Sequence, residues 1–141
     1  MIKLATTKEE LEKIFQLRYE VLRKPWNQTY ESSFDELDKI SYNAFIEESS
    51  ICIACGRLDI LNSTTAQIRY MAVKPEYRGK HYGQQVLVYL EKLAKEKGIQ
   101  KIILHARENA VDFYLKNNYK IIQPSHLLFN TIQHYLMEKT L

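Results

Sequence analysis

Hydrophobic residues in the first half of the chain follow one helical pattern and several strand patterns. Residues 2–5 predict a short strand, and Thr7-x-x-Glu10 is a capping box that predicts a helix extending to about Leu22. The buried face of this helix is expected to comprise the residues at helical spacing, Leu11, Ile14, Phe15 and Leu22. Strands are predicted at about residues 42–48, 50–61 and 66–73. Short polar turns join them, so we expect an antiparallel meander.

The second half alternates between helix and strand patterns. A helix ending before Gly98 is predicted by apolar residues three or four apart, Val86, Leu87, Leu90, Leu93 and Ala94. Residues 101–106 are typical of a strand buried on both faces, which a right-handed crossover would pair parallel to the 66–73 strand. Asn109 is expected to cap a helix that runs to Asn117. Strands at 119–123 and 133–139 should follow, separated by a loop over residues 124–131.

Together these elements predict one domain over residues 1–141, of the mixed α/β (α+β) class, with a central and mostly antiparallel sheet flanked by helices. A chain of 141 residues with 45% hydrophobic and 26% charged residues is ordinary for a globular protein. The N-terminus lacks a signal-peptide core and no apolar run reaches membrane length, so a cytoplasmic protein without membrane contact is expected. The net charge is +3, and the lysines are scattered along the chain rather than grouped in a stripe. This distribution does not indicate nucleic-acid binding.

Cys52-Ile53-Ala54-Cys55 has the spacing of a zinc or redox pair. On the predicted 50–61 strand, residues three apart point to opposite faces, so the two sulfurs should diverge. No second pair of cysteines or histidines completes four ligands. We therefore expect two core cysteines and no metal site.

The most informative segment runs from Ile68 to Leu87, where an apolar strand passes through a short basic turn into the amphipathic helix. Helix N-termini bind phosphates through their free N–H groups and positive dipole. Arg78 and Lys80 add positive charge, and Gly79 and Gly83 let an anion approach the backbone. The pattern indicates a pyrophosphate site, although a solvated strand-to-helix turn has the same shape.

The flanking motifs resemble those of the Gcn5-related N-acetyltransferases (GNAT family). The resemblance covers about residues 66–123 and rests on Met71-Ala72-Val73, on Arg78-x-x-His81-x-Gly83, on Asn109, and on Phe113-Tyr114-x-Lys116-x-Asn118-Tyr119. This chain differs from the family at His81, where the first glycine of the turn is usual. It differs again at Asn118-Tyr119, which replaces a Gly-Phe pair.

The resemblance implies a fold in which two central parallel strands diverge and coenzyme A lies in the opening. Main-chain groups of Met71 and Val73 would hold the pantetheine arm, and Ala72 between them would also belong to the cofactor site. The pyrophosphate would bind the turn formed by Arg78, Gly79, Lys80, His81, Tyr82, Gly83 and Gln84, and Asn109 and Tyr114 would also contact the cofactor. The implied activity is acetyl transfer from acetyl-CoA to a primary amine by direct attack in a ternary complex.

The resemblance also places the general acid of the family at Tyr114, and a phenol is suited to protonating a departing thiolate. The carboxylate that often serves as base has no counterpart, because Arg69 and Tyr70 stand at the corresponding positions. The remaining candidates for the proton acceptor are Glu47, Glu48, Asp59, His105 and His134. Among these, His105 lies on a strand beside the expected cleft and titrates in the useful range.

Several alternatives stay open at this point. Residues 24–38 combine aromatic and acidic side chains, which either line a pocket for a cationic amine or form a loop packed by its aromatics. Arg69 either pairs with an acid of that loop or binds a carboxylate of the acceptor. Polyamines, amino acids, aminoglycosides and protein amines all remain candidate acceptors, and the donor could carry a longer acyl chain. A non-catalytic acyl-CoA sensor is the alternative function, and the resemblance allows for a homodimer through the late strands.

Overall fold

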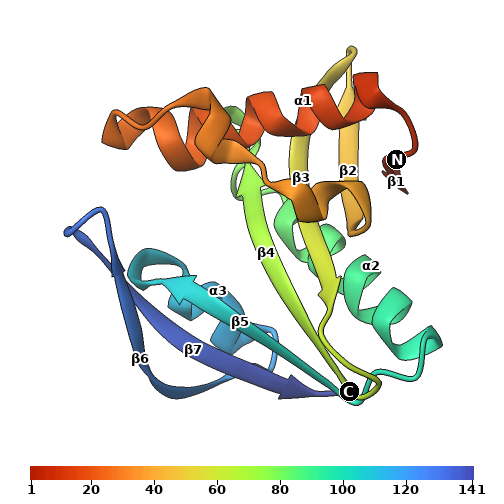
Figure 1. The fold of residues 1–141 in the computed structure, drawn as a ribbon, viewed down its shortest axis with the longest axis vertical. Coiled ribbons are helices and arrows are strands. Elements are labelled where there is room, and N and C mark those ends of the chain that lie inside the picture. Colours follow the sequence, from red (N-terminus) through yellow and green to blue (C-terminus); the bar gives the residue numbers. More distant parts are fainter.

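The computed structural model describes residues 1–141 and is organised around a seven-stranded sheet with the order β1-β2-β3-β4-β5-β7-β6 (Figure 1). The strands are β1 (Ile2–Leu4), β2 (Tyr42–Glu48), β3 (Ile51–Ile60), β4 (Thr65–Val73), β5 (Lys101–Arg107), β6 (Lys120–Leu128) and β7 (Ile132–Thr140). Only β4 and β5 pair in parallel, and every other neighbouring pair is antiparallel. The predicted fold class and meander are confirmed.

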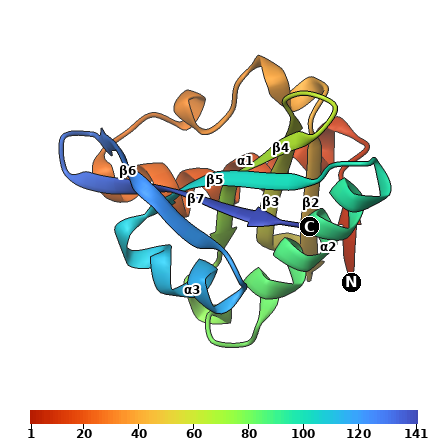
Figure 2. The ribbon, with the colours of Figure 1, turned by 90° about the horizontal axis from the view of Figure 1, so that it is seen from below.

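Helices cover both faces of this sheet (Figure 2). Helix α1 (Lys8–Arg18) lies on one face, where Ile14 and Leu17 pack in a buried cluster of 7 residues. Helices α2 (Tyr82–Glu96) and α3 (Val111–Lys116) lie on the other face and contribute to a cluster of 18 buried residues. None of the helices has the length and hydrophobicity needed to cross a membrane. The remaining helical turns are short, at Tyr19–Arg23, Lys24–Trp26, Tyr30–Ser33, Glu36–Lys39, Pro75–Tyr77 and Glu108–Ala110.

Strands β4 and β5 diverge soon after they pair, which opens the centre of the sheet (Figure 1). Their pairing is confined to Thr65–Gln67 against Lys101–Ile103. Beyond that point β4 stays with β3 as far as Val73, whereas β5 stays with β7 as far as Arg107. The predicted opening is therefore present, and its two walls belong to different halves of the sheet.

An irregularity in the β3–β4 pairing shapes one wall of this opening. The register shifts between Cys55 and Arg57, and Tyr70 on β4 has a left-handed backbone with φ of 56°. Gly56 lies at the shift, and a Cβ there would clash with the sulfur of Met71. Gly56 is therefore required for the close packing of β3 against Met71 and helix α2.

Three details of the secondary structure differ from prediction. Helix α3 begins at Val111 after Ala110, so the side chain of Asn109 does not cap it. Strand β6 extends through the predicted 124–131 loop to Leu128, because Pro124 stands at a register shift on the edge strand, where a missing N–H is tolerated. Strand β5 is buried on alternate residues only, since its other face looks into the opening.

The two cysteines are core residues, as predicted, but their side chains do not diverge. Both are free, about 1–2% exposed, and belong to the cluster under α1. The β2–β3 register shifts after Ile46, so that Ala54 opposes Ile46 while Cys52 opposes Glu47. The intervening Ile53 is the extra residue of a bulge, which breaks the alternation and places both cysteines on one face.

The acidic loop at residues 31–38 neutralises buried arginines. Arg18 and Arg57 are fully buried, and Asp38 contacts Arg18 at 3.0 Å and Arg57 at 3.2 Å. Asp35 binds Arg57 at 2.8 Å, and Asp59 on β3 contacts the same guanidinium at 2.8 Å. The loop aromatics also pack inward, with Phe34 stacked on Phe15 at 4.7 Å between ring centroids. The structure thus favours the packed-loop alternative over a pocket for a cation.

Candidate functional site

The turn before α2 presents unpaired N–H groups at the head of a large cleft. Gly79 and His81 have left-handed backbones with φ of 77° and 65°, and α2 starts at the next residue, Tyr82. No N–H group from Gly79 to Gln84 donates to an acceptor in the protein. The first turn of α2 carries no acidic side chain. His81 therefore adopts the conformation that glycine usually provides, and the positive end of the helix stays open.

Gly83 lets this helix start approach its neighbours closely. A Cβ at Gly83 would lie 3.3 Å from Cγ2 of Val73 and 3.5 Å from Cζ of Phe113. The backbone of Gly83 has an ordinary negative φ, so the requirement for glycine comes from space. The turn, the end of β4 and α3 are consequently packed together around one end of the cleft.

The large cleft, about 970 Å³ in volume, joins almost all the residues predicted to bind the cofactor. The predicted residues on its wall are Met71, Ala72, Val73, Arg78, Gly79, His81, Tyr82, Gly83, Gln84, Asn109 and Tyr114. Lys80 lies on the turn but not on the wall, with its ammonium 5.5 Å from the centre of the Tyr77 ring. Asn109, released from the predicted capping role, lines the cleft instead.

The main chain of β4 faces the cleft at alternate residues. The N–H of Lys74 donates to the carbonyl of Ile53 on β3 at 2.8 Å. Because main-chain groups alternate in direction along a strand, those of Val73 point away from β3, into the opening left by β5. Ala72 has its main chain directed to β3 opposite Cys55. Val73 thus offers an unpaired donor and acceptor along the cleft, and Ala72 does not. Met71 lines the same cleft but lies within the register shift.

Tyr114 on α3 lines the large cleft and also a second cavity that adjoins it. Its ring is 6% exposed and packs edge-on against Phe113 and Tyr119. No hydrogen bond within the protein involves its hydroxyl, and burial raises the pKa of this phenol. Tyr114 therefore presents a protonated hydroxyl to the space that the two cavities share.

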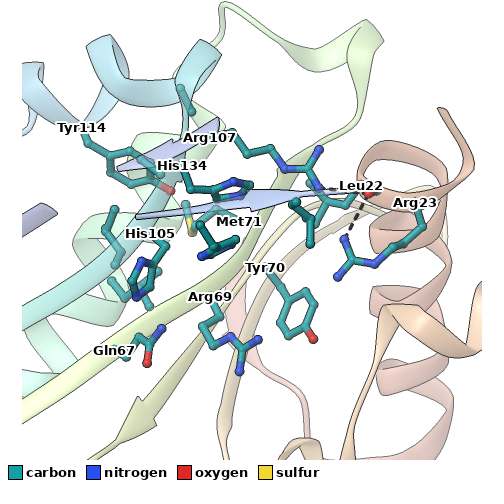
Figure 3. Close-up of a pocket in the computed structure, with 16 residues that line it drawn as sticks. Leu22, Arg23, Gln67, Arg69, Tyr70, Met71, His105, Arg107, Tyr114 and His134 are labelled. Carbon is teal, nitrogen blue, oxygen red and sulfur yellow. Dashed lines mark hydrogen bonds between the residues drawn. The ribbon is translucent and has the colours of Figure 1, made fainter. Parts of the chain in front are cut away.

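The second cavity, called here the small cavity, has a volume of about 210 Å³ (Figure 3). It shares with the large cleft the residues Leu22, Met71, Arg107, Ala110 and Tyr114. Its remaining wall comes from Arg23 at the end of the Tyr19–Arg23 turn, from β4 and β5, and from the β6–β7 hairpin. This wall includes His105 on β5, His126 on β6 and His134 on β7. A molecule in the small cavity would therefore meet a molecule in the large cleft beside Tyr114.

Three histidines from three strands gather on one side of the small cavity. The ring centroids of His105 and His126 are 5.3 Å apart, and those of His126 and His134 are 4.3 Å apart. Burial lowers the pKa of His105, and the nearby His126 and Arg69 lower it further. Burial likewise lowers the pKa of His134, whose Nδ1 lies 3.0 Å from the Ile132 carbonyl. These rings are not arranged as metal ligands. The lowered pKa values of His105 and His134 favour the neutral forms of these two rings at pH 7.

The other candidate bases lie away from both cavities. Glu47 pairs with Lys13 at 3.1 Å, and Asp59 is committed to Arg57 and to the Ser41 hydroxyl. Glu48 is exposed at the far end of β2 and lines neither cavity. Of the proposed proton acceptors, only His105 and His134 reach the site.

Two site residues, Arg23 and Arg107, were not anticipated from the sequence. Arg107 lies two residues after His105, so strand alternation places both on the same face of β5. That signal was present in the sequence. Arg23 lies at the end of an irregular helical turn, where no periodicity indicates direction.

Comparisons with known proteins support a relationship across the whole chain. The model of the acetyltransferase (GNAT) family matches residues 9–119. The uncharacterized N-acetyltransferase YjcF of Bacillus subtilis (strain 168) is 28% identical over 136 residues, which cover 96% of this chain and 96% of that protein. The crystal structure of a putative N-acetyltransferase from Lactobacillus plantarum has a TM-score of 0.87 at 20% identity, covering 100% of this chain and 97% of the other. A GNAT family acetyltransferase from Elizabethkingia anophelis, with acetyl-CoA bound, has a TM-score of 0.82 at 16% identity, covering 100% and 97%.

The solved structures share the fold, and the family match spans the splayed strands, the turn and Tyr114. The chain therefore belongs to the GNAT family of acetyltransferases.

Proposed function

We propose that the protein transfers an acetyl group from acetyl-CoA to a primary amine by direct attack within a ternary complex. The observation that carries the proposal is the continuous path from unpaired N–H groups at residues 79–84, along the large cleft, to Tyr114 and the small cavity. This path has an anion site at one end and a protonated phenol at the other.

The residues of the cleft fit the chemistry of coenzyme A. Its pyrophosphate would accept hydrogen bonds from the N–H groups of Tyr82, Gly83 and Gln84, with Arg78 adding positive charge at the cleft wall. Its amide-containing arm would pair with the main chain of Met71 and Val73, in place of the strand that has diverged. The thioester would then lie near Tyr114, at the junction with the small cavity.

The proposed mechanism requires a neutral amine, and the protein supplies a group that can accept its proton. A lysine-like amine with a pKa of about 10.4 is mostly protonated at pH 7, and freeing its lone pair costs roughly 4–5 kcal/mol. His105 lines the small cavity and has a lowered pKa, so its imidazole is neutral and available as the acceptor, directly or through a water. The amine nitrogen then bonds to the thioester carbon.

Collapse of the resulting intermediate breaks the carbon–sulfur bond and releases a thiolate. Tyr114 would donate its hydroxyl proton to the sulfur, as the general acid, and the second proton that the nitrogen loses on becoming an amide would restore the phenol. Burial holds this phenol in its protonated form at neutral pH, which leaves the proton available until the sulfur becomes basic. The cysteines play no part in this scheme, because Cys52 and Cys55 are buried under α1, outside both cavities.

The decisive experiment compares Tyr114→Phe with the wild type in thiol release from acetyl-CoA and in CoA binding by calorimetry. Loss of a general acid should lower kcat by about 10²–10⁴-fold, while the Kd for CoA stays near the wild-type value because the ring remains. Tyr42→Phe is the matched control, since Tyr42 lies on β2 outside both cavities.

Two results would contradict the proposal. Unchanged turnover in Tyr114→Phe would remove the tyrosine from the mechanism. CoA binding without turnover of any amine, in the wild type, would favour the acyl-CoA sensor instead.

A further inference from the structure

The small cavity is lined by basic side chains without any acidic residue. Its polar wall contains Arg23, Arg69, Arg107, His105, His126 and His134, together with Gln67, Tyr70 and Tyr114. The nearby carboxylates of Asp35, Asp38 and Asp59 are bound to Arg18 and Arg57 and do not line the cavity. The cavity is thus positively charged, which is the opposite of what a polycationic acceptor requires.

Arg23 and Arg107 converge on a single neutral acceptor (Figure 3). Nη1 of Arg23 and Nη2 of Arg107 donate to the carbonyl of Leu22 at 3.1 Å and 3.0 Å. Neither guanidinium has a carboxylate within 4.0 Å. Nε of Arg23 also donates to the carbonyl of Ser32 at 3.0 Å, whereas Nε and Nη1 of Arg107 have no acceptor in the protein. Burial, and then repulsion from Arg23, lowers the pKa of Arg107 to about 10. Two adjacent, partly buried cations therefore lack a neutralising anion.

Aromatic rings fix the positions of both guanidiniums. Arg107 lies over the ring of Trp26 at 4.7 Å from its centroid. Arg23 lies between Tyr70 at 5.7 Å and Phe129 at 5.6 Å. Held in this way, Nη2 of Arg23 and both Nε and Nη1 of Arg107 keep N–H groups without an acceptor, and guanidinium N–H groups match the oxygens of a carboxylate or phosphate.

Arg69 is a weaker candidate for this role. Its guanidinium is 4.0 Å from Asp35, and its side chain is 41% exposed. Of the two alternatives left open by the sequence, the structure favours pairing of Arg69 with an acid of the loop.

From this arrangement we propose that the acceptor is a small amine that also carries an oxyanion, a carboxylate or a phosphate, which Arg23 and Arg107 bind in the small cavity. The inference rests on the proposed function for the presence of the amine, and it places that amine toward Tyr114 with the oxyanion at the arginines. It favours amino-acid-like acceptors over polyamines and aminoglycosides.

Trp26 offers a direct readout, because it is the single tryptophan of the chain and contacts Arg107. The CoA-saturated protein is titrated with four product-like probes while Trp26 fluorescence is recorded. The probes are N-acetylglycine, N-acetylphosphoethanolamine, the neutral N-acetylglycinamide and the cationic N-acetylputrescine. Because a charge-assisted hydrogen bond is stronger than a neutral one, at least one oxyanion probe should bind about tenfold or more tightly than the amide.

Variants assign the effect to the two arginines. Arg107→Gln and Arg23→Gln should each abolish most of that discrimination, and Arg107→Lys should restore part of it. Lys92→Gln, which removes a positive charge from the exposed face of α2, should leave it unchanged. The wild-type titration tests the proposal even if an arginine variant fails to fold.

The outcomes separate this inference from the proposed function. Preference for the carboxylate or for the phosphate supports the inference and identifies the group. Equal affinities, a preference for N-acetylputrescine, no binding of any probe, or discrimination that survives both arginine substitutions would overturn it. Calorimetry with CoA alone, performed first, tests the proposed function separately, because it does not depend on the small cavity.

Discussion

Asp38 is the carboxylate through which the buried ion network joins α1 to the sheet beneath the small cavity. It is 5% exposed and contacts Arg18 through both oxygens, at 3.1 Å and 3.0 Å. It also contacts Arg57 at 3.2 Å and accepts from the N–H of Asp35 at 3.0 Å. Asp38→Asn keeps the shape of this side chain and removes its charge.

The expected loss in the free energy of unfolding depends on which partners Arg18 and Arg57 keep in Asp38→Asn. Arg57 keeps Asp35 and Asp59, whereas Arg18 loses its only carboxylate and keeps the Ser33 carbonyl and the Asn43 side chain. Removing one partner of a buried ion pair costs about 3–5 kcal/mol, and the polar contacts left to Arg18 place the expected loss near 3 kcal/mol. For a chain of 141 residues, this corresponds to a decrease in Tm of about 10 °C.

The assay is urea and thermal unfolding, with Glu36→Gln as the matched control. Glu36 pairs with Lys39 on the surface, where the side chains are 89% and 77% exposed, so its loss should leave Tm almost unchanged. A loss of less than about 1 kcal/mol in Asp38→Asn would refute the reasoning, because an uncompensated buried guanidinium costs more than that.

The pH dependence of stability tests the same network, because the pKa of Asp38 determines whether stability is lost toward acid or toward base. Burial by itself would raise the pKa of Asp38, but the hydrogen bonds and charge of Arg18, the N–H of Asp35 and the charge of Arg57 together outweigh it and hold the pKa below 3.8, its ordinary value. A carboxylate of this kind stabilises the folded state above the unfolded-state pKa, and the contribution is lost as pH falls through the folded-state pKa. The wild type should therefore lose stability below about pH 4, and Asp38→Asn should lose less over the same interval.

Three further predictions concern the site. In His105→Asn the acidic limb of the pH profile of kcat should disappear, because a base acts only when deprotonated. In Arg69→Gln that limb should move to higher pH, since Arg69 lowers the pKa of His105. pH profiles of both variants that coincide with the wild-type profile would exclude His105 as the base. Gly83→Val should weaken CoA binding by at least about tenfold in calorimetry, because bulk added there meets Val73 and the cleft, and about 1–3 kcal/mol is typical of overpacking. Gly56→Ala should lower the free energy of unfolding by about 1–3 kcal/mol, because the new Cβ meets Met71, Val86 and Leu90; unchanged stability would show that α2 moves away freely.

The elements with strong periodicity could be predicted from the sequence. The amphipathic pattern of α2, the meander and the parallel pairing of β4 with β5 follow from local spacing and from the handedness of crossovers. The turn at residues 78–84 was recognisable as well, because its charge and glycine positions are local features. The structure adds that His81 adopts the left-handed backbone conformation although it is not a glycine.

Features that depend on a neighbouring strand could not be predicted. The bulge that brings Cys52 and Cys55 to one face appears only in the β2–β3 register, and β6 passes through Pro124 only because it is an edge strand. The charge of the small cavity has the same origin. The acids near residue 35 suggested a cation pocket, but tertiary contacts commit them to Arg18 and Arg57 and leave Arg23 and Arg107 at the cavity.

The two halves of the sheet are joined only by the short pairing between β4 and β5, so the sheet is weakly held together at its centre. Where the strands separate, the amide of Val73 faces away from β3 and has no partner strand on that side, so in the empty protein its hydrogen is accessible to exchange with solvent. A ligand arm that carries amides would occupy that place as a temporary extra strand and bridge the two halves of the sheet. Binding of the acetyl donor would then make the wall formed by β4 and β5 more rigid, and the amine must be positioned against that same wall.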